Sequence, residues 1–555
     1  MPDLGLPTVK EARRLAAAYR AWPGPSTALP SEVLEWFGER QAHGLAAELQ
    51  LEVDPREGAH ADAQTFASLT RRQVLGGVAA VSAAGVLTAM GSSSAAAVGH
   101  HPKVVVVGAG LAGLSCTYRL RRNGIKAHLY DAQQRLGGRC WSITDYFDNG
   151  QTAEHGGQYV DSRHKQLRAL AAELGVELID TFKQSIPSGS QGYRWIKGSL
   201  RTSDEVFGEF GSFIRKLTRA YKRVGDYHWN TASDAAREFD RMTMVESLDK
   251  KVDGGANSLL GRGIQVFMQS FFGMEPSEMS PINLFEAFVA PYPGANERFR
   301  IAGGNDQLVK ALVRAIPSHA ITRGALLVSA RHRSDGRVAL RFWGDSKEVV
   351  ADRVVMALPF TTLRDVDIDH LHLSRRRRRA INQLAMGSNS KLNFQLDQSI
   401  KSLDWNGSFS SDKPHYVTWD STWGQVDPHP RTPVITIYNG GKEGRSYPTY
   451  QPHGVAPDAV IDTALDNLAR GVQGIRRAFN GLAHLDQWAD DPYVHGSYAG
   501  FGPGQYTSYW GFLAKREGNV FFAGEHTSTH SQGYLNGGVE SGERAAQQVL
   551  HTLGK

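Results

Sequence analysis

One stretch decides the fold of this 555-residue chain: Val104-Val-Val-Val-Gly108-Ala-Gly110-Leu-Ala-Gly113. An apolar β-branched run enters a glycine turn, which predicts a buried strand and then a helix over about 111–123. Gly108 permits the tight bend, Gly110 lets the backbone approach a pyrophosphate, and Gly113 lets the helix pack closely on the strand. The helix N-terminus, with its free N–H groups and its dipole, favours an anion.

A second strand and an acidic residue complete this unit. Ala127-His-Leu-Tyr130 ends at Asp131, about twenty residues beyond the glycines, where a carboxylate can accept hydrogen bonds from both ribose hydroxyls. A glycine motif alone is weak evidence. The whole order of strand, turn, helix, strand and acid predicts an α/β, Rossmann-like (GxGxxG) domain that binds a dinucleotide.

Further glycine motifs separate flavin from nicotinamide cofactors. Arg135-Leu-Gly-Gly138-Arg139 follows the acid, and Glu154-His-Gly-Gly157-Gln158-Tyr159 comes soon after it. Near the C-terminus, Phe521-Phe-Ala-Gly524-Glu525 runs on to Gly533-Tyr534-Leu535-Asn-Gly-Gly. These motifs resemble those of the flavin amine oxidase superfamily. The resemblance implies FAD and a monoamine oxidase-like fold, in which discontinuous segments build the FAD domain beside an α+β substrate domain.

The resemblance also implies which residues hold the cofactor and which act on the substrate. The residues expected to contact FAD are Gly108, Gly110, Gly113, Asp131, Gly138, Arg139, Gly157, Gln158, Val328, Gly524, Glu525 and Leu535. The residues expected to be catalytic are Lys391, Trp488, Tyr498 and Tyr534.

Each catalytic expectation follows the monoamine and polyamine oxidase branch. Lys391 begins a predicted strand, and the family's lysine at this place reaches the flavin N5 atom through a water and is implicated in the reaction with oxygen. Trp488 matches a tryptophan that lies against the flavin. Tyr498 and Tyr534 match two aromatic walls that flank the amine and orient it. The alternatives are a solvated strand lysine and two core tyrosines.

Two departures from family patterns narrow the chemistry. In monoamine oxidases with covalent flavin a cysteine precedes the first cage tyrosine, whereas Ser497 stands here, so FAD is expected to be bound non-covalently. L-Amino acid oxidases place an arginine shortly after the Glu154 segment to clamp the substrate carboxylate. Tyr159 and Val160 occupy those positions here, although Arg163 is nearby. An amine without an α-carboxylate is therefore favoured.

The expected reaction is oxidation of a primary or secondary amine by hydride transfer to flavin. The imine is hydrolysed to an aldehyde, and O2 is reduced to hydrogen peroxide. An L-amino acid oxidase or a desaturating biosynthetic relative would share the fold and the flavin, and a protein that keeps FAD as a structural ligand is the non-enzymatic alternative. The expected partners are a small-molecule amine and O2. Which amine is used, and whether the chain forms a homodimer, stays open.

An export signal is expected ahead of the flavin domain. Thr70-Arg71-Arg72 precedes an apolar run to Met90 and then Ala95-Ala-Ala97, a pattern typical of twin-arginine signals, which carry folded proteins. Because about seventy residues precede the arginines, an uncleaved anchor or an Ala-rich linker in a cytoplasmic protein is the alternative. The apolar run is roughly seventeen residues, short for a membrane span, so no stable membrane association is expected.

The chain length exceeds a single core, so several domains are expected. They are an N-terminal extension (1–69), the signal or linker (70–100), an FAD-binding domain (101–185, 301–364 and 486–555) and a substrate-binding domain (186–300 and 365–485).

Charge and cysteine usage argue against other classes of protein. The net charge is only +6, and no aromatic residue interleaves with the densest basic run, 375–379, so a solvated helix face is favoured over contact with nucleic acid. The two cysteines, Cys116 and Cys140, fall in the flavin domain and are expected to be core thiols. No metal site is expected.

Overall fold

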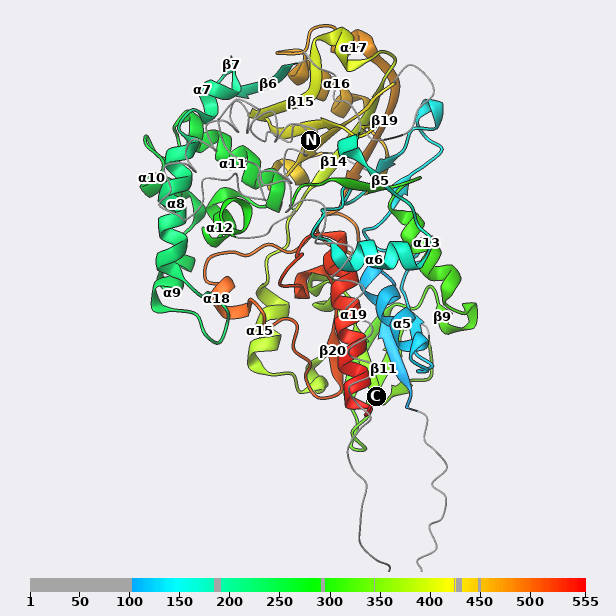
Figure 1. Cartoon of the computed structure of the whole chain (residues 1–555). Helices are drawn as coiled ribbons and strands as arrows, with labels where there is room; N and C mark the ends of the chain where they lie inside the picture. The colour runs from blue at the N-terminus through cyan, green and yellow to red at the C-terminus, as the bar shows by residue number, and fades with distance from the viewer. Residues whose placement is uncertain are drawn as a thin grey trace, which may run out of the picture. The chain divides into compact units, whose positions relative to one another are not determined.

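A five-stranded parallel sheet carries the glycine motif (Figure 1). Its order is β20-β13-β1-β2-β9, and every pair of neighbours runs parallel. The strands are β1 (Val104–Val107), β2 (His128–Tyr130), β9 (Ile321–Thr322), β13 (Arg353–Met356) and β20 (Val520–Phe522). The four valines of β1 are buried, as expected for a strand covered on both faces. The predicted α/β fold class is confirmed.

The structure is a computed structural model that describes residues 102–183, 191–290, 295–343, 345–423, 425, 432–447 and 451–555. These residues belong to one compact unit. The extension 1–69 and the signal-like segment 70–100 lie outside the described residues. Within the described part of the chain, no helix has both the length and the apolar character that a membrane span needs.

The first and last helices of the described chain pack against each other. α5 (Leu111–Arg122, blue in Figure 1) lies beside α19 (Leu535–Thr552, red). A glycine makes this close approach possible, because a Cβ at Gly542 would clash with the carbonyl of Ala112. Gly113 likewise lets α5 pack on its own glycine turn, since a Cβ there would clash with the carbonyl of Gly108. The N-terminal and C-terminal flavin motifs are thereby joined over one face of the parallel sheet.

A smaller antiparallel sheet and several short elements complete this half of the structure. A hairpin turn at 334–337 joins β10 (Leu327–His332) to β11 (Val338–Phe342), and β12 (Val349–Ala351) pairs with β11. The other elements here are β3 (Ser142–Ile143), β4 (Ala153–Glu154), α6 (Lys165–Glu173), β5 (Leu178–Asp180), β8 (Phe299–Ile301), α13 (Asp306–Ala315) and α14 (Phe360–Leu363).

An eight-stranded sheet, order β18-β19-β14-β17-β16-β15-β6-β7, forms the second half. Its strands are β6 (Gln191–Ile196), β7 (Ser199–Arg201), β14 (Ser390–Leu396), β15 (Trp405–Asp412), β16 (His415–Asp420), β17 (Val434–Asn439), β18 (His453–Val455) and β19 (Phe479–Gln487). The other helices of the described residues are α7 (Ser203–Phe207), α8 (Phe210–Val224), α9 (Asp234–Asp240), α10 (Met244–Lys251), α11 (Leu259–Phe272), α12 (Ile282–Phe288), α15 (Arg375–Gln383), α16 (Asp458–Leu468), α17 (Ile475–Ala478) and α18 (Tyr506–Tyr509).

The side chains of β14 alternate between the two faces of the eight-stranded sheet. Leu392, Phe394 and Leu396 belong to a cluster that includes apolar residues of α16. Successive side chains of a strand point to opposite faces, so Lys391 and Asn393 face the other side of the sheet.

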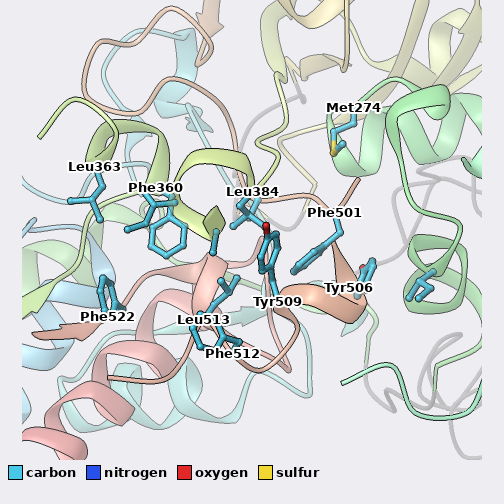
Figure 2. Close-up of a cluster of buried hydrophobic side chains, with 14 of the residues drawn as sticks. Met274, Phe360, Leu363, Leu384, Phe501, Tyr506, Tyr509, Phe512, Leu513 and Phe522 are labelled. Carbon is cyan, nitrogen blue, oxygen red and sulfur yellow. The ribbon is translucent and has the colours of Figure 1, made fainter. Parts of the chain in front are cut away.

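One hydrophobic cluster connects the parallel sheet with the helices around the substrate half. It extends from Val105 and Phe522 on the sheet to Leu248 and Ile264 on the helices. Figure 2 shows its middle, where Phe360 and residues of the 501–513 segment point toward one another. The two halves therefore share a core.

The prediction of a solvated arginine face is wrong at its centre. Arg377 of α15 is fully buried, and its guanidinium group lies 4.0 Å from the Phe522 ring centre and donates to the carbonyls of Phe512, Leu513 and Lys515. Burial lowers its pKa to about 10. Carbonyls outside regular strands and helices need donors from elsewhere, and the arginine that points inward supplies them.

Candidate active site

One cavity is lined by the first glycine turn, by the glycine motifs that follow Asp131 and by the C-terminal flavin motif. It has a volume of about 440 Å³, within the range of roughly 300–1,000 Å³ typical of ligand sites. Every predicted site residue except Gly113 lines it. Gly113 lies instead where the helix crosses the glycine turn, which is the packing role expected of it.

The glycine turn presents bare backbone to the cavity. Gly108 has φ +100°, and a Cβ there would meet the carbonyl of Ala357. At Gly110 the nearest atom to an added Cβ is the Gly137 oxygen, 3.9 Å away, so that face is open. The Gly137–Gly138 pair lies on the same turn, since Gly137 N donates to the Ala109 carbonyl at 2.9 Å. The N-terminus of α5 is thus accessible to a ligand.

Asp131 stands at the end of β2, as predicted, and binds the turn itself. Its two carboxylate oxygens accept from Ala109 N at 2.5 Å and from Gln133 N at 2.8 Å. Burial raises the pKa of this carboxyl, and the two backbone donors oppose the rise. Each oxygen keeps a further lone pair for a ligand hydroxyl.

Asp131→Ala is expected to weaken FAD binding by roughly 1.5–3 kcal/mol, because it removes charge-assisted acceptors. The measurement is titration of apoprotein with FAD, with Asp131→Asn as the control that keeps one acceptor oxygen. A variant with full flavin occupancy and unchanged affinity would show that Asp131 is misassigned.

Glu525 joins the loops that carry the two predicted tyrosines. Its Oε1 accepts from Arg139 Nη1 at 2.9 Å and from Ala499 N at 3.1 Å, while its Oε2 accepts from Gly533 N at 2.8 Å. Arg139 also donates to the Ser497 carbonyl at 2.6 Å. Arg139 and Glu525 therefore hold in place the residues on both sides of Tyr498 and the residue before Tyr534.

The remaining predicted cofactor residues lie around the same cavity. Gly157 faces Leu535, whose Cγ would be 3.4 Å from a Cβ at that glycine. The Gln158 side-chain oxygen accepts a hydrogen bond from Trp419 Nε1 at 3.0 Å, so it is already engaged by another side chain of the protein. Val328 lines the cavity from β10, and Gly524 lines it from the turn after β20.

Lys391 is buried and points to the cavity. Its side chain lies on β14 with 2% of the residue exposed, and Nζ donates to the Gly156 carbonyl at 3.1 Å. Burial lowers the pKa of Lys391 to about 8, and the carboxylates of Glu154 and Asp486 oppose this effect. An amine of this pKa changes its charge near neutral pH, which a solvated lysine would not do.

Trp488 is buried, and the two tyrosines are half-buried, on the cavity wall. Trp488 Nε1 donates to the His155 carbonyl at 2.8 Å. Tyr498 donates to the Phe271 carbonyl at 2.6 Å, and its ring lies against Gly533, directly before Tyr534. Burial raises the pKa of both tyrosines, so both stay protonated.

Other cavity residues had no signal in the sequence. Glu297 has φ +49°, and its Oε2 is buried without a hydrogen-bond partner among the described residues. Burial, together with the nearby Asp161, raises the pKa of Glu297 to about 8. The cavity wall also includes His155, Trp419 and Tyr438. These residues come from separate strands and loops, so only the fold groups them.

The position of an α-carboxylate clamp is otherwise occupied. Val160 exchanges two backbone hydrogen bonds with Phe299, at 2.7 and 2.8 Å. Arg163 Nε donates to Asp161 Oδ2 at 2.9 Å, and its guanidinium lies 5.3 Å from the Tyr534 ring centre. The nearby arginine is thus paired with a carboxylate of the protein.

The lining fits a flavin dinucleotide. At one end are the open glycine turn, Asp131 and the N-terminus of α5, whose first turn carries no acidic side chain. At the other end are aromatic walls and Lys391. The first end suits a pyrophosphate and a ribose, and the second suits a planar ring.

Comparisons with known proteins agree with this geometry. The family model of flavin containing amine oxidoreductase matches residues 111–550. Amine oxidase [flavin-containing] A of Sus scrofa is 25% identical over 490 residues, 82% of this chain and 86% of its own. Pseudooxynicotine dehydrogenase of a Pseudomonas species is 25% identical over 521 residues, 87% of this chain and 96% of its own.

Solved structures show the same fold. Cyclohexylamine oxidase from Brevibacterium oxydans IH-35A superposes with a TM-score of 0.70 and 20% identity, over 82% of this chain and all of that one. Putrescine oxidase bound to putrescine gives a TM-score of 0.68 at 18% identity, over 81% of this chain and 99% of that one. Because the family match spans most of the chain, this protein belongs to the flavin-containing amine oxidoreductases and is a flavin-dependent amine oxidase.

Proposed function

We propose that this enzyme oxidises a primary or secondary amine without an α-carboxylate, using non-covalently bound FAD and O2. The products are hydrogen peroxide and an imine, which is hydrolysed to an aldehyde. The observation that carries the proposal is the meeting of Lys391, Trp488, Tyr498 and Tyr534 on one cavity with the FAD motifs.

The bound flavin supplies the redox chemistry by accepting a hydride and passing electrons to O2. The side chains of this chain supply position and environment. Tyr498 and Tyr534 orient the neutral amine between them and exclude water. Lys391 holds a proton on Nζ beside the Gly156 carbonyl, where its charge favours the reduction of oxygen.

Glu297 and Arg163 shape the substrate side of the cavity. Because its pKa is raised to about 8, the Glu297 carboxyl is mostly protonated at neutral pH, and its buried, unpartnered Oε2 on the cavity wall can form a hydrogen bond with a neutral amine. The arginine nearest Tyr534 is already engaged by Asp161.

A substrate panel tests this proposal. Purified holoenzyme is mixed anaerobically with cyclohexylamine, tyramine, putrescine and several L-amino acids, and the bleaching of the flavin absorbance is followed. We expect bleaching by at least one of the amines and slow or no bleaching by the amino acids. Faster bleaching by an amino acid would overturn the substrate class, and no bleaching by any compound would favour a structural role for FAD.

Trichloroacetic acid is expected to release the flavin. Ser497 Oγ donates to Asn389 Oδ1 at 2.6 Å. It is a hydroxyl and not the thiol through which a cysteine at this position would attach to flavin. Cys116 and Cys140 are buried free thiols away from the cavity lining, as core thiols should be, and burial raises the pKa of both. The precipitated protein should be colourless under a yellow supernatant, and yellow protein would contradict non-covalent binding.

We also propose that residues 70–100 direct export by the twin-arginine route. The pair Arg71 and Arg72 is the part of the signal that its receptor reads. Changing both residues to lysine should retain the enzyme inside the producing cells, as measured by immunoblots of cell and medium fractions. Equal export of the variant and the parent would contradict this.

A further inference from the structure

A buried carboxylate surrounded by imidazole rings lies beside the catalytic candidates. Asp486 on β19 is fully buried, and its Oδ1 accepts from Nδ1 of His155 at 2.6 Å and from Nδ1 of His453 at 2.8 Å. His453 Nε2 lies 3.1 Å from Asp491 Oδ2, and His484 Nδ1 lies 3.4 Å from Asp486 Oδ2. The predicted reaction gives none of these residues a role.

Strand register places this carboxylate next to Lys391. His453 on β18 pairs with Asp486, Asp486 pairs with Lys391 on β14, and Lys391 pairs with Tyr438 on β17. Directly paired residues of antiparallel strands point to the same face. The four side chains therefore form one row across the sheet, and Lys391 and Tyr438 line the cavity at its end.

The same network holds the backbone beside the cavity. His155, bonded to Asp486 through its ring, accepts from Trp488 Nε1 at its carbonyl oxygen, and the next carbonyl, of Gly156, accepts from Lys391 Nζ. The His155 ring also stacks on Trp141 with 3.4 Å between ring centres. The consecutive carbonyls of His155 and Gly156 thus position Trp488 and Lys391. The hydrogen bond from the His155 ring to Asp486 anchors this stretch of backbone.

We propose that Asp486 is a positioning residue for this active site: through His155 it fixes the carbonyls that hold Trp488 and Lys391, and its charge retains the ammonium form of Lys391. The inference rests on the proposed function of Lys391.

The charges around Lys391 support this assignment. The carboxylates of Glu154 and Asp486 raise the pKa of Lys391, whereas the charge of Arg300 lowers it. The Trp419 ring centre is 5.6 Å from Nζ. Although burial acts to raise the pKa of Asp486, the charge of His155 and the hydrogen bonds from the imidazoles hold it well below its usual range. Burial raises the pKa of Glu154 to about 7, so Asp486 is the carboxylate that stays ionised across the neutral range.

A metal ion is the rival explanation of the cluster. Among the described residues, His155, His453 and Asp486 offer ligand atoms within 4.8 Å of one another. However, both Nδ1 atoms lie at hydrogen-bond distance from the same carboxylate oxygen, and this geometry accounts for the contacts without an ion.

The test follows the visible absorption of the oxidised flavin in the holoenzyme as pH is raised. The parent enzyme should show a transition near pH 8 from Lys391, and Lys391→Met should lack it. Asp486→Asn removes the negative charge, so its transition should fall by roughly one pH unit or more. His453→Gln keeps the carboxylate, so its transition should stay at or above the parent value.

Three outcomes would overturn the inference: an unchanged transition in Asp486→Asn, an equal fall in His453→Gln, or stoichiometric metal in the purified enzyme. A second measurement needs no variant, since two carboxylate-bound imidazole protons should appear far downfield in proton spectra of ¹⁵N-histidine-labelled holoenzyme. Their absence also overturns it. Failure of all amines to bleach the flavin would remove the proposed function alone, because neither measurement uses substrate.

Discussion

Tyr534→Ala is expected to slow flavin reduction by amine roughly 10- to 100-fold, about 1.4–2.7 kcal/mol of barrier, while FAD stays bound. The same holds for Tyr498→Ala. The physical reason is loss of orientation, since each ring forms part of the cavity wall and neither tyrosine is among the residues expected to hold the dinucleotide. Anaerobic stopped-flow measurement of flavin reduction gives the rate, and the flavin-to-protein ratio checks the occupancy.

The phenylalanine variants are the matched controls. Tyr534→Phe keeps the ring face and should be much milder than Tyr534→Ala. Tyr498→Phe loses the bond to the Phe271 carbonyl and the 3.1 Å contact with the Tyr438 hydroxyl, so it should cost somewhat more, yet less than alanine. If phenylalanine were as damaging as alanine at both positions, the hydroxyls would be the working groups and the aromatic-wall proposal would fail.

Lys391→Met should slow the reaction of the reduced enzyme with oxygen on the order of 100-fold, and more than it slows reduction by amine. Methionine keeps most of the buried volume and removes the ammonium group, so the change tests charge. Enzyme reduced by one equivalent of amine is mixed with oxygenated buffer in a stopped-flow instrument. Lys310→Met, on the exposed face of α13, is the control and should react like the parent. Two unaffected half-reactions would remove Lys391 from the site.

The pH dependence of the oxygen reaction supplies a second check on Lys391. Its pKa is lowered to about 8, so the ammonium form predominates below that pH and is lost as pH rises through it. The rate with oxygen should therefore fall above about pH 8 in the parent enzyme. In Lys391→Met the rate should be low and independent of pH over the same interval, and a surviving transition near pH 8 would assign it to another group.

Much of the flavin half of this protein could be predicted because its signals are local. A run of valines, three glycines and an acid predicted β1, α5 and β2, and the helix predicted over 111–123 is Leu111–Arg122. The last helix begins at Leu535, inside the C-terminal flavin motif. Backbone conformation in these segments follows from steric limits and side-chain periodicity, both of which neighbouring residues determine.

Arg377 shows where local evidence ends. Within 375–379 every side chain carries the same charge, and nothing adjacent distinguishes the middle one. Its burial depends on carbonyls of residues 512–515, which are more than one hundred positions away. A local pattern could not indicate which arginine those acceptors would need.

By itself, the sequence determined the dinucleotide unit, the flavin motifs and, through a family resemblance, four catalytic candidates. Only the tertiary structure decided what surrounds them: Asp486 opposite Lys391, His155 beneath Trp488, and Glu297 on the cavity wall. The physical reason is distance along the chain. Strand pairing brings together side chains that are tens to hundreds of residues apart, and their charges act on one another only after burial has removed the water between them.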